Sequence, residues 1–309
     1  MCFPRHTVLL GLLVLQGCAV ALETIEPAPT VTWVLPDLGS DGDEEEARLR
    51  QEVEQAFQAL QASPRSEDRI IWYGRRLAYL GFYEEAIDVY SLGLAMHPYS
   101  PKLLRHRGHR YITLRRFPEA VADLERAARL IYARVDEIEP DGIPNAKNRP
   151  RSSLHTNVWY HLGLVRYCRG EYERAIYSYE QCIQAARNRD MESAARYWLY
   201  LSAMRLGDKQ RAKAALAPIR PFWNLVEDRT YLDLILLFRG DLSLEEVQKK
   251  DGPASENPTL AYGLACYQMI QGNKARGFAA LRTLGAKSLP DFGCVAAEAD
   301  LALSAAPPR

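Results

Sequence analysis

The pattern of small and apolar residues repeats early in the chain after an interval of 34 residues. Tyr83, Ala86 and Tyr90 have counterparts one interval later in Phe117, Ala120 and Leu124. The same shift relates four further positions, so that Gly74, Arg76, Leu80 and Glu85 return as Gly108, Arg110, Leu114 and Glu119. A unit of this length is too small to bury its own apolar face, so the repeat predicts units that stack on one another.

Glycine marks the predicted end of the first helix in most units, where it suits a left-handed turn. These residues are Gly81, Gly170, Gly207, Gly240 and Gly272, with Arg115 in the equivalent place of the second unit. The units share two further kinds of position. Small residues occur at 74, 86, 108, 120, 163 and 175, and aromatic residues occur at 83, 90, 117, 172 and 179. The combination resembles the tetratricopeptide repeat, a pair of antiparallel helices. The resemblance implies an all-α, right-handed superhelical solenoid of antiparallel helix pairs, about five to six units long.

Six units are expected, three that match the pattern well and three that are degenerate. The good matches are 67–100, 101–134 and 156–189, and the degenerate ones are 193–224, 226–256 and 258–288. We assign the solenoid to 43–303, with capping helices, and residues 304–309 to a disordered tail. An amphipathic helix with Leu49, Val53 and Phe57 on one face is expected to cap the first unit. About 21 extra residues separate the second and third units, and the inserted loop at 135–155 lies beside the expected groove, either as a functional element or as a tolerated insertion.

Residues 1–21 are typical of an export signal. Arg5 precedes an apolar stretch, Val8 to Leu15, that is too short to span a bilayer. The sequence Leu15-Gln16-Gly17-Cys18 resembles a bacterial lipobox, which makes Cys18 the candidate for lipidation. Cleavage at Ala19-Val20-Ala21 is the alternative and would give a secreted or soluble periplasmic protein. We expect export to the bacterial periplasm with a lipid tether, by resemblance at the outer membrane, and a flexible linker at 22–42 rich in Pro and Gly.

Composition narrows the function further. The chain has 309 residues, 39 Lys or Arg and 39 Asp or Glu, so its formal net charge is zero. The absence of a basic excess argues against nucleic acid as a partner. Four cysteines remain outside the amino terminus, and their spacing fits neither a disulfide framework nor a metal site, so Cys168, Cys182, Cys266 and Cys294 are expected to be buried free thiols.

Motifs for catalysis or cofactor binding are not found, so we predict no enzyme activity, no cofactor and no metal. The run from Arg105 to Arg110 contains His106 and His109, which could share a helix face and bind a metal. A third ligand is not evident and the neighbouring cations would oppose a divalent ion. We therefore expect an exposed polar helix face here.

The family resemblance implies which side chains face the concave groove. By that resemblance the first helix of each unit supplies inward positions, and the groove has a basic start and an aromatic middle. The predicted partner-binding residues are Arg75, Tyr79, Lys102, Arg105, His109, Asn157, Tyr160 and Tyr167. Arginine and tyrosine in such a groove suit an extended protein or peptide segment that is acidic or bears a free carboxylate. The chain's own acidic residues at 41–46 are another possible occupant.

The sequence therefore predicts a protein-protein interaction scaffold or adaptor of the bacterial cell envelope. Two alternatives stay open at this point. The first is a small-ligand receptor or enzyme with a pocket beside the 135–155 loop that uses His106, His109 and Tyr160. The second is a structural homo-oligomer that stacks through the degenerate repeats.

Overall fold

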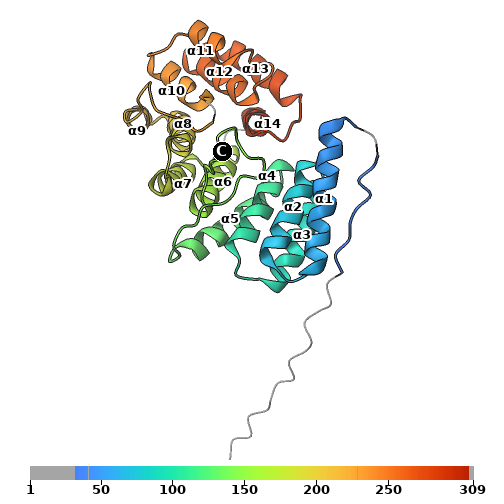
Figure 1. Ribbon diagram of the computed structural model, residues 1–309. Helices are drawn as coiled ribbons and strands as arrows, with labels where there is room; N and C mark the ends of the chain where they lie inside the picture. The colour runs from blue at the N-terminus through green and yellow to red at the C-terminus, as the bar shows by residue number, and fades with distance from the viewer. Residues whose placement is uncertain (1–31, 41, 228, 306–309) are drawn as a thin grey trace, which may run out of the picture. The chain divides into compact units, whose positions relative to one another are not determined.

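The computed structural model of the protein describes residues 32–40, 42–227 and 229–305 (Figure 1). The described helices belong to one compact unit that begins at Trp33. The predicted signal segment with Cys18, most of the predicted linker and the last four residues of the predicted tail lie outside the described residues. Within the described ranges no helix combines the length and the apolar content needed to cross a lipid bilayer.

The described residues form fourteen α-helices. In chain order they are α1 Glu44–Ala62, α2 Glu67–Tyr79, α3 Tyr83–Met96, α4 Pro101–Thr113, α5 Phe117–Ile131, α6 Leu154–Cys168, α7 Tyr172–Ala185, α8 Arg189–Leu206, α9 Lys209–Leu216, α10 Thr230–Arg239, α11 Leu244–Asp251, α12 Pro258–Ile270, α13 Lys274–Gly285 and α14 Phe292–Ala305. Six packed pairs run from α2/α3 to α12/α13, and α1 packs against α2 (Figure 1). The predicted class, an all-α array of helix pairs, is confirmed.

The residues that end the first helices share one backbone conformation. The φ angles are 91° at Gly81, 73° at Gly170, 83° at Gly207, 84° at Gly240 and 89° at Gly272. Arg115, the residue in the equivalent place of the second pair, has a φ of 61°, which is unusual for a side-chain-bearing residue. Each turn reverses the chain within two to four residues, so that the second helix of the pair runs back along the first.

Close approach within the pairs depends on a second glycine position that recurs in the first three pairs. A Cβ at Gly74 would lie 2.5 Å from the Tyr90 ring, and one at Gly163 would lie 2.7 Å from the Tyr179 ring. In the second pair a Cβ at Gly108 would lie 2.8 Å from Leu124 Cγ. The large residue of the second helix therefore packs directly against the backbone of the first. This contact explains why small and aromatic positions recur together in the sequence.

The insertion between α5 and α6 crosses the inner side of the array instead of looping away from it. An isolated antiparallel bridge pairs Ile138 with Ser153. The carbonyl oxygens of Pro140 and Gly142 accept hydrogen bonds from Arg75 Nη2 and Arg76 Nη1, at 3.0 and 3.1 Å. The insertion is thereby fixed to α2, although α2 lies more than sixty residues earlier in the chain.

Helix α14 also makes a connection that the repeat pattern does not predict. It contacts α12 and α13, and in addition α4 and α6 near the start of the array. Arg115 donates to both carboxylate oxygens of Glu298, at 2.8 and 2.6 Å, and to the Leu289 carbonyl oxygen at 2.9 Å. The last helix is therefore tied to the second pair, through the side chain at the unusual left-handed position.

The cysteine prediction is confirmed for the part of the chain that the structure describes. Cys168, Cys182, Cys266 and Cys294 are free and buried. Burial raises the pKa of the Cys168, Cys182 and Cys266 thiols, which makes them unreactive packing groups at neutral pH.

We predict that Gly163→Ala lowers the free energy of unfolding relative to Gly285→Ala, by about 1–3 kcal/mol. Both substitutions place alanine in a helix, but a Cβ at 163 meets the buried Tyr179 ring, whereas one at 285 has its nearest neighbour at 3.4 Å. Urea denaturation followed by circular dichroism measures the difference. Equal stabilities for the two variants would show that the Tyr179 ring can move aside.

Candidate functional site

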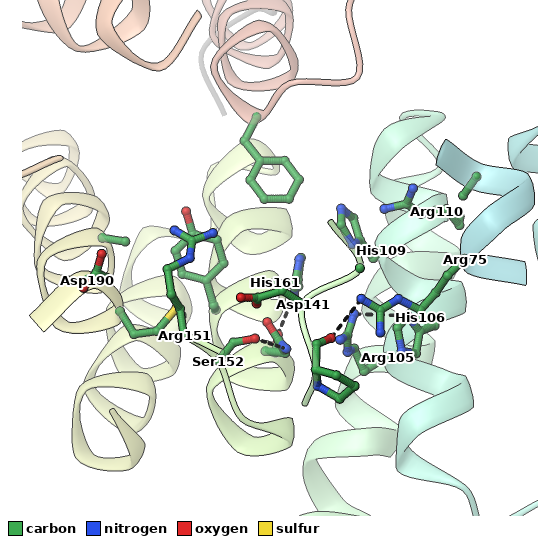
Figure 2. A pocket seen from close by; sticks show the side chains of 18 of the residues that line it. Arg75, Arg105, His106, His109, Arg110, Asp141, Arg151, Ser152, His161 and Asp190 are labelled. Carbon is green, nitrogen blue, oxygen red and sulfur yellow. Dashed lines mark hydrogen bonds between the residues drawn. The ribbon is translucent and has the colours of Figure 1, made fainter. Parts of the chain in front are cut away.

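A pocket of about 330 Å³ lies on the inner side of the array, between α2, α4, α6 and α8 (Figure 2). The insertion contributes Pro140, Asp141 and Gly142 to its lining, and Phe292 of α14 lines it from another side. The volume is in the range of small-molecule sites in proteins. What the resemblance presents as an open groove is therefore walled by two additional segments of the same chain.

Helix α4 supplies four polar side chains from two consecutive turns to this pocket: Arg105, His106, His109 and Arg110. The expectation that this run forms an exposed polar face is wrong. Arg105 and His106 are each only 6% exposed, because α6 and the insertion pack over the inner side of α4. The His106 ring stacks on Tyr90, and the His109 ring lies 4.3 Å from that of His161.

Glu139 of the insertion occupies the basic part of the expected groove. Its carboxylate accepts from Arg105 Nε at 2.9 Å and Nη2 at 2.5 Å, and both side chains are more than nine-tenths buried. The Asn157 amide donates to the same carboxylate. Lys102 pairs with Glu137 at 2.9 Å in a more exposed position. Acidic residues of the chain do dock here, but they come from the insertion.

Of the segment at 41–46, considered above as an occupant of the groove, residue 41 lies outside the described residues and the other acidic residues are used elsewhere. Asp43 caps α1 by accepting from the Glu46 amide at 2.9 Å, and Glu45 pairs with Arg48 of the same helix. Acidic residues in the first turn of a helix are stabilised by its dipole. The first turn of α1 therefore accounts for these carboxylates without a groove contact.

Arg75 and Tyr79 of α2 meet the insertion at its tightest point. Arg75 donates to the Tyr79 hydroxyl at 3.1 Å and to the Pro140 carbonyl oxygen. A Cβ at Gly142 would collide with the Tyr79 hydroxyl, so glycine lets the insertion approach α2 without displacing that side chain. Neither of these hydrogen bonds gives the Arg75 guanidinium a carboxylate partner.

Arg110 extends into the same region and has no carboxylate within ion-pair distance among the described residues. Its guanidinium carbon lies 5.7 Å from the centre of the Tyr83 ring. Burial lowers the pKa of Arg110, although a guanidinium stays charged at any physiological pH. Of the three guanidinium groups on Arg75, Arg105 and Arg110, only that of Arg105 therefore pairs with a carboxylate, that of Glu139.

The three histidines beside these arginines are neutral. Burial and then the neighbouring guanidinium charges lower the pKa of His106 and His109 well below the usual value, and they lower that of His161 to about 3. Arg105 Nη1 lies 3.2 Å from His106 Nδ1, which accepts the hydrogen bond. His161 Nδ1 donates to the Asn157 carbonyl oxygen at 2.6 Å. Protonation of these rings would add charge to an already cationic wall.

Aromatic side chains form the opposite wall. The Tyr160 hydroxyl bonds to that of Tyr231 at 3.0 Å and accepts from Trp198 Nε1 at 2.9 Å. The Phe292 ring lies 5.3 Å from the His109 ring and 6.1 Å from the Tyr160 ring. Tyr160 is held by two hydrogen bonds, so this wall is rigid.

Two carboxylates line the pocket on the side of α8 and the insertion (Figure 2). Asp190 accepts from the backbone amides of Val226 and Glu227, at 2.8 and 2.9 Å. Asp141 accepts from the Asn145 side chain at 3.0 Å. Neither forms an ion pair with the arginines of α2 and α4. Arg151 lines the pocket on this side too, and its guanidinium pairs with Glu227.

Six of the eight predicted groove residues line this one pocket: Arg75, Tyr79, Arg105, His109, Asn157 and Tyr160. Lys102 lies beside it, on the ion pair with Glu137. Tyr167 lies elsewhere, 1% exposed, with its hydroxyl 2.7 Å from that of Tyr262. Its position in the core removes it from any surface contact.

The sequence reasoning missed Arg110, His161 and Phe292. Arg110 lies outside the inward positions that the resemblance implies, and it reaches the pocket because its side chain is long. Phe292 comes from α14, more than a hundred residues away, and nothing in its local sequence indicates that contact. In the described part of the chain no group of His, Cys, Asp and Glu side chains has the arrangement of a metal site.

Comparison with known families gives no match: no protein-family model matches the chain, and no curated protein does. Among solved structures, a tetratricopeptide repeat protein from Parabacteroides merdae is 17% identical with a TM-score of 0.49, and the match covers 82% of this chain and 92% of that one. YrrB, described as a TPR protein with an unusual peptide-binding site, is 14% identical with a TM-score of 0.42, over 81% of this chain and 99% of that one. The repeat assignment rests on the helix pairs and closing turns described above, and these likenesses carry no information on function.

We predict that Glu139→Gln lowers the free energy of unfolding by about 3 kcal/mol, because it leaves the buried Arg105 without its counter-ion. The matched control is Glu137→Gln, whose pair with Lys102 is half exposed and is expected to contribute less than about 1 kcal/mol. Urea denaturation gives both values, and amide hydrogen exchange over 135–153 shows whether the insertion loosens in the first variant only. Similar losses in the two variants would contradict the role of Glu139 as the anchor.

Stability is expected to fall as the pH drops from about 6.5 towards about 3, because the folded-state pKa of His161 lies near 3 and the unfolded-state value near 6.5. In this window the unfolded chain binds a proton that the folded chain does not. The free energy of unfolding therefore falls by up to about 1.4 kcal/mol per pH unit for each such histidine. Urea denaturation at about pH 7.5 and about pH 5 measures the slope. His161→Gln should flatten it, and His97→Gln, outside the pocket, is the matched control. An unchanged slope in His161→Gln would show that this ring binds its proton equally well in the folded and the unfolded chain.

Proposed function

We propose that this protein is an interaction scaffold of the bacterial cell envelope, exported by residues 1–21 and tethered through a lipid on Cys18. Stacked helix pairs provide extended surfaces that such proteins use for binding. The proposed partner is a protein segment with apolar and acidic side chains. The proposal includes no catalytic step.

One observation carries the choice of surface: large apolar side chains are exposed on and next to the insertion. The exposed fractions are 89% for Tyr132, 93% for Val135, 58% for Ile138 and 60% for Ile143. Apolar groups gathered on one exposed segment favour burial under a partner. Arg134 and Arg149 are exposed on the same segment and suit acidic residues in that partner.

The predicted groove residues act in this proposal through the insertion that they hold. Arg105 and Asn157 fix Glu139, Lys102 fixes Glu137, and Arg75 fixes Pro140. A segment fixed in this way loses little conformational freedom when a partner binds, which favours affinity. An extended peptide lying inside the groove, as the sequence analysis expects, would have to displace the buried Glu139. The outer side of the insertion is therefore the proposed binding surface.

A photo-crosslinking residue at Val135, introduced into the chain in its native cells, should give a discrete crosslinked protein. The matched control is the same residue at Phe222, which is 81% exposed but lies outside the insertion. In the chain without the crosslinker, Val135→Asp should reduce co-purification of that protein at least tenfold, because a charge replaces an apolar contact in the interface. Equal crosslinking at the two positions would refute the insertion as the binding surface, and crosslinks of the chain to itself would favour the homo-oligomer.

A further inference from the structure

The cationic side of the enclosed pocket contains more positive charge than its carboxylates neutralise. Arg75 is 8% exposed, and its hydrogen bonds go to a hydroxyl and a carbonyl oxygen. Arg110 forms no ion pair among the described residues. Glu139 is bonded to Arg105 and Asn157, and His106 and His109 stay neutral because burial lowers the pKa of each ring. Two guanidinium charges, one buried on Arg75 and one partly buried on Arg110, thus remain without a carboxylate partner, where buried charges are normally paired.

We propose that the pocket binds a small organic oxyanion, a carboxylate or phosphate carried on a compact and partly apolar body. Arg110 and Arg75 bind the oxyanion, because a guanidinium presents its N–H groups as a fork that matches carboxylate and phosphate oxygens. His109 and His161 flank this position with neutral imidazoles. Tyr160, Tyr231 and Phe292 contact the body of the molecule.

The small volume and the walls of this partly open pocket are the reason for choosing a free small molecule over a peptide. The volume of about 330 Å³ holds a metabolite-sized compound, and the insertion and Phe292 wall the pocket where a longer chain would have to leave it. On the α8 side Asp141 and Asp190 accept hydrogen bonds from the chain and Arg151 pairs with Glu227, so the cations without a carboxylate partner are Arg75 and Arg110. The inference goes beyond the proposed partner surface, which lies on the outer side of the insertion.

The test uses the purified chain and four probes: inorganic phosphate, phenyl phosphate, phenylacetate and, as the neutral control, benzyl alcohol. Thermal unfolding and isothermal titration calorimetry report binding. The aromatic anions are expected to bind with a Kd below about 1 mM and to raise the Tm, whereas benzyl alcohol does neither. Inorganic phosphate is expected to bind more weakly than phenyl phosphate, because it makes no contact with the aromatic wall. Failure of all three anions to bind would overturn the proposal.

Arg110→Met removes the charge and keeps an apolar stem of similar length. We expect it to weaken phenyl phosphate binding at least tenfold and to leave the Tm of the ligand-free protein unchanged or higher, because it removes a charge that Arg75 and Arg105 repel. Arg110→Lys keeps the charge but loses the fork, and is expected to bind with intermediate affinity. Arg69→Met removes an exposed charge from α2 outside the pocket and should bind like the unmodified chain.

Two outcomes would overturn the assignment of Arg110: undiminished binding by Arg110→Met, or a fall in its ligand-free Tm that Arg110→Lys restores without restoring anion binding. The first would show that the guanidinium does not contact the ligand, and the second that its role is structural. Crosslinking at Val135 is an independent readout. Loss of anion binding with intact crosslinking would separate this inference from the proposed scaffold function.

Discussion

The buried ion pair between Arg105 and Glu139 is the contact on which the inner side of the molecule depends. It joins the first half of an inserted segment to the second helix pair, in a position where both side chains are more than nine-tenths buried. A buried ion pair gives little net stability, because desolvation offsets the attraction between the charges. It does select one docked position, since a shift of the insertion by one residue would leave a charge buried without a partner. The pair is therefore better understood as a determinant of register than as a source of stability.

Fixing that register changes what the repeat architecture can do. A stack of helix pairs normally offers an open concave face. Here the insertion covers one part of that face, and Phe292 on α14 closes another, helped by the contact of Arg115 with Glu298. Arg115 is the one non-glycine residue among the six closing turns, and its side chain makes the connection that a glycine could not. The enclosed pocket and the exposed outer side of the insertion are two consequences of the same docking.

The sequence predicts the repeat well, because the repeat depends on residue types at fixed spacings along the chain. Glycine at a left-handed turn, and glycine facing a large residue sixteen positions later, each leave a mark at a fixed spacing, as at Gly74 and Tyr90. The eight predicted groove residues follow from the inward positions that the family resemblance implies, and six of them meet in one pocket. The exposure of the α4 side chains to water could not be predicted in the same way. Whether His106 faces water or a stacked Tyr90 depends on the insertion and on α6, whose packing over α4 has no periodic signal.

Electrostatics on the inner side argue that the pocket is more than a packing defect. A core under selection for stability alone would have an apolar residue at position 110, because a charge beside Arg75 and Arg105 destabilises the folded chain. The lowered pKa of His161 shows how strongly burial and the neighbouring charges act on a titratable group here. Clustered like charges in an enclosed, partly aromatic pocket are the kind of destabilising arrangement that proteins keep at functional sites. The same charge excess that weakens the empty pocket would strengthen the binding of an anion within it, so the cost in stability and the proposed function have a common physical origin.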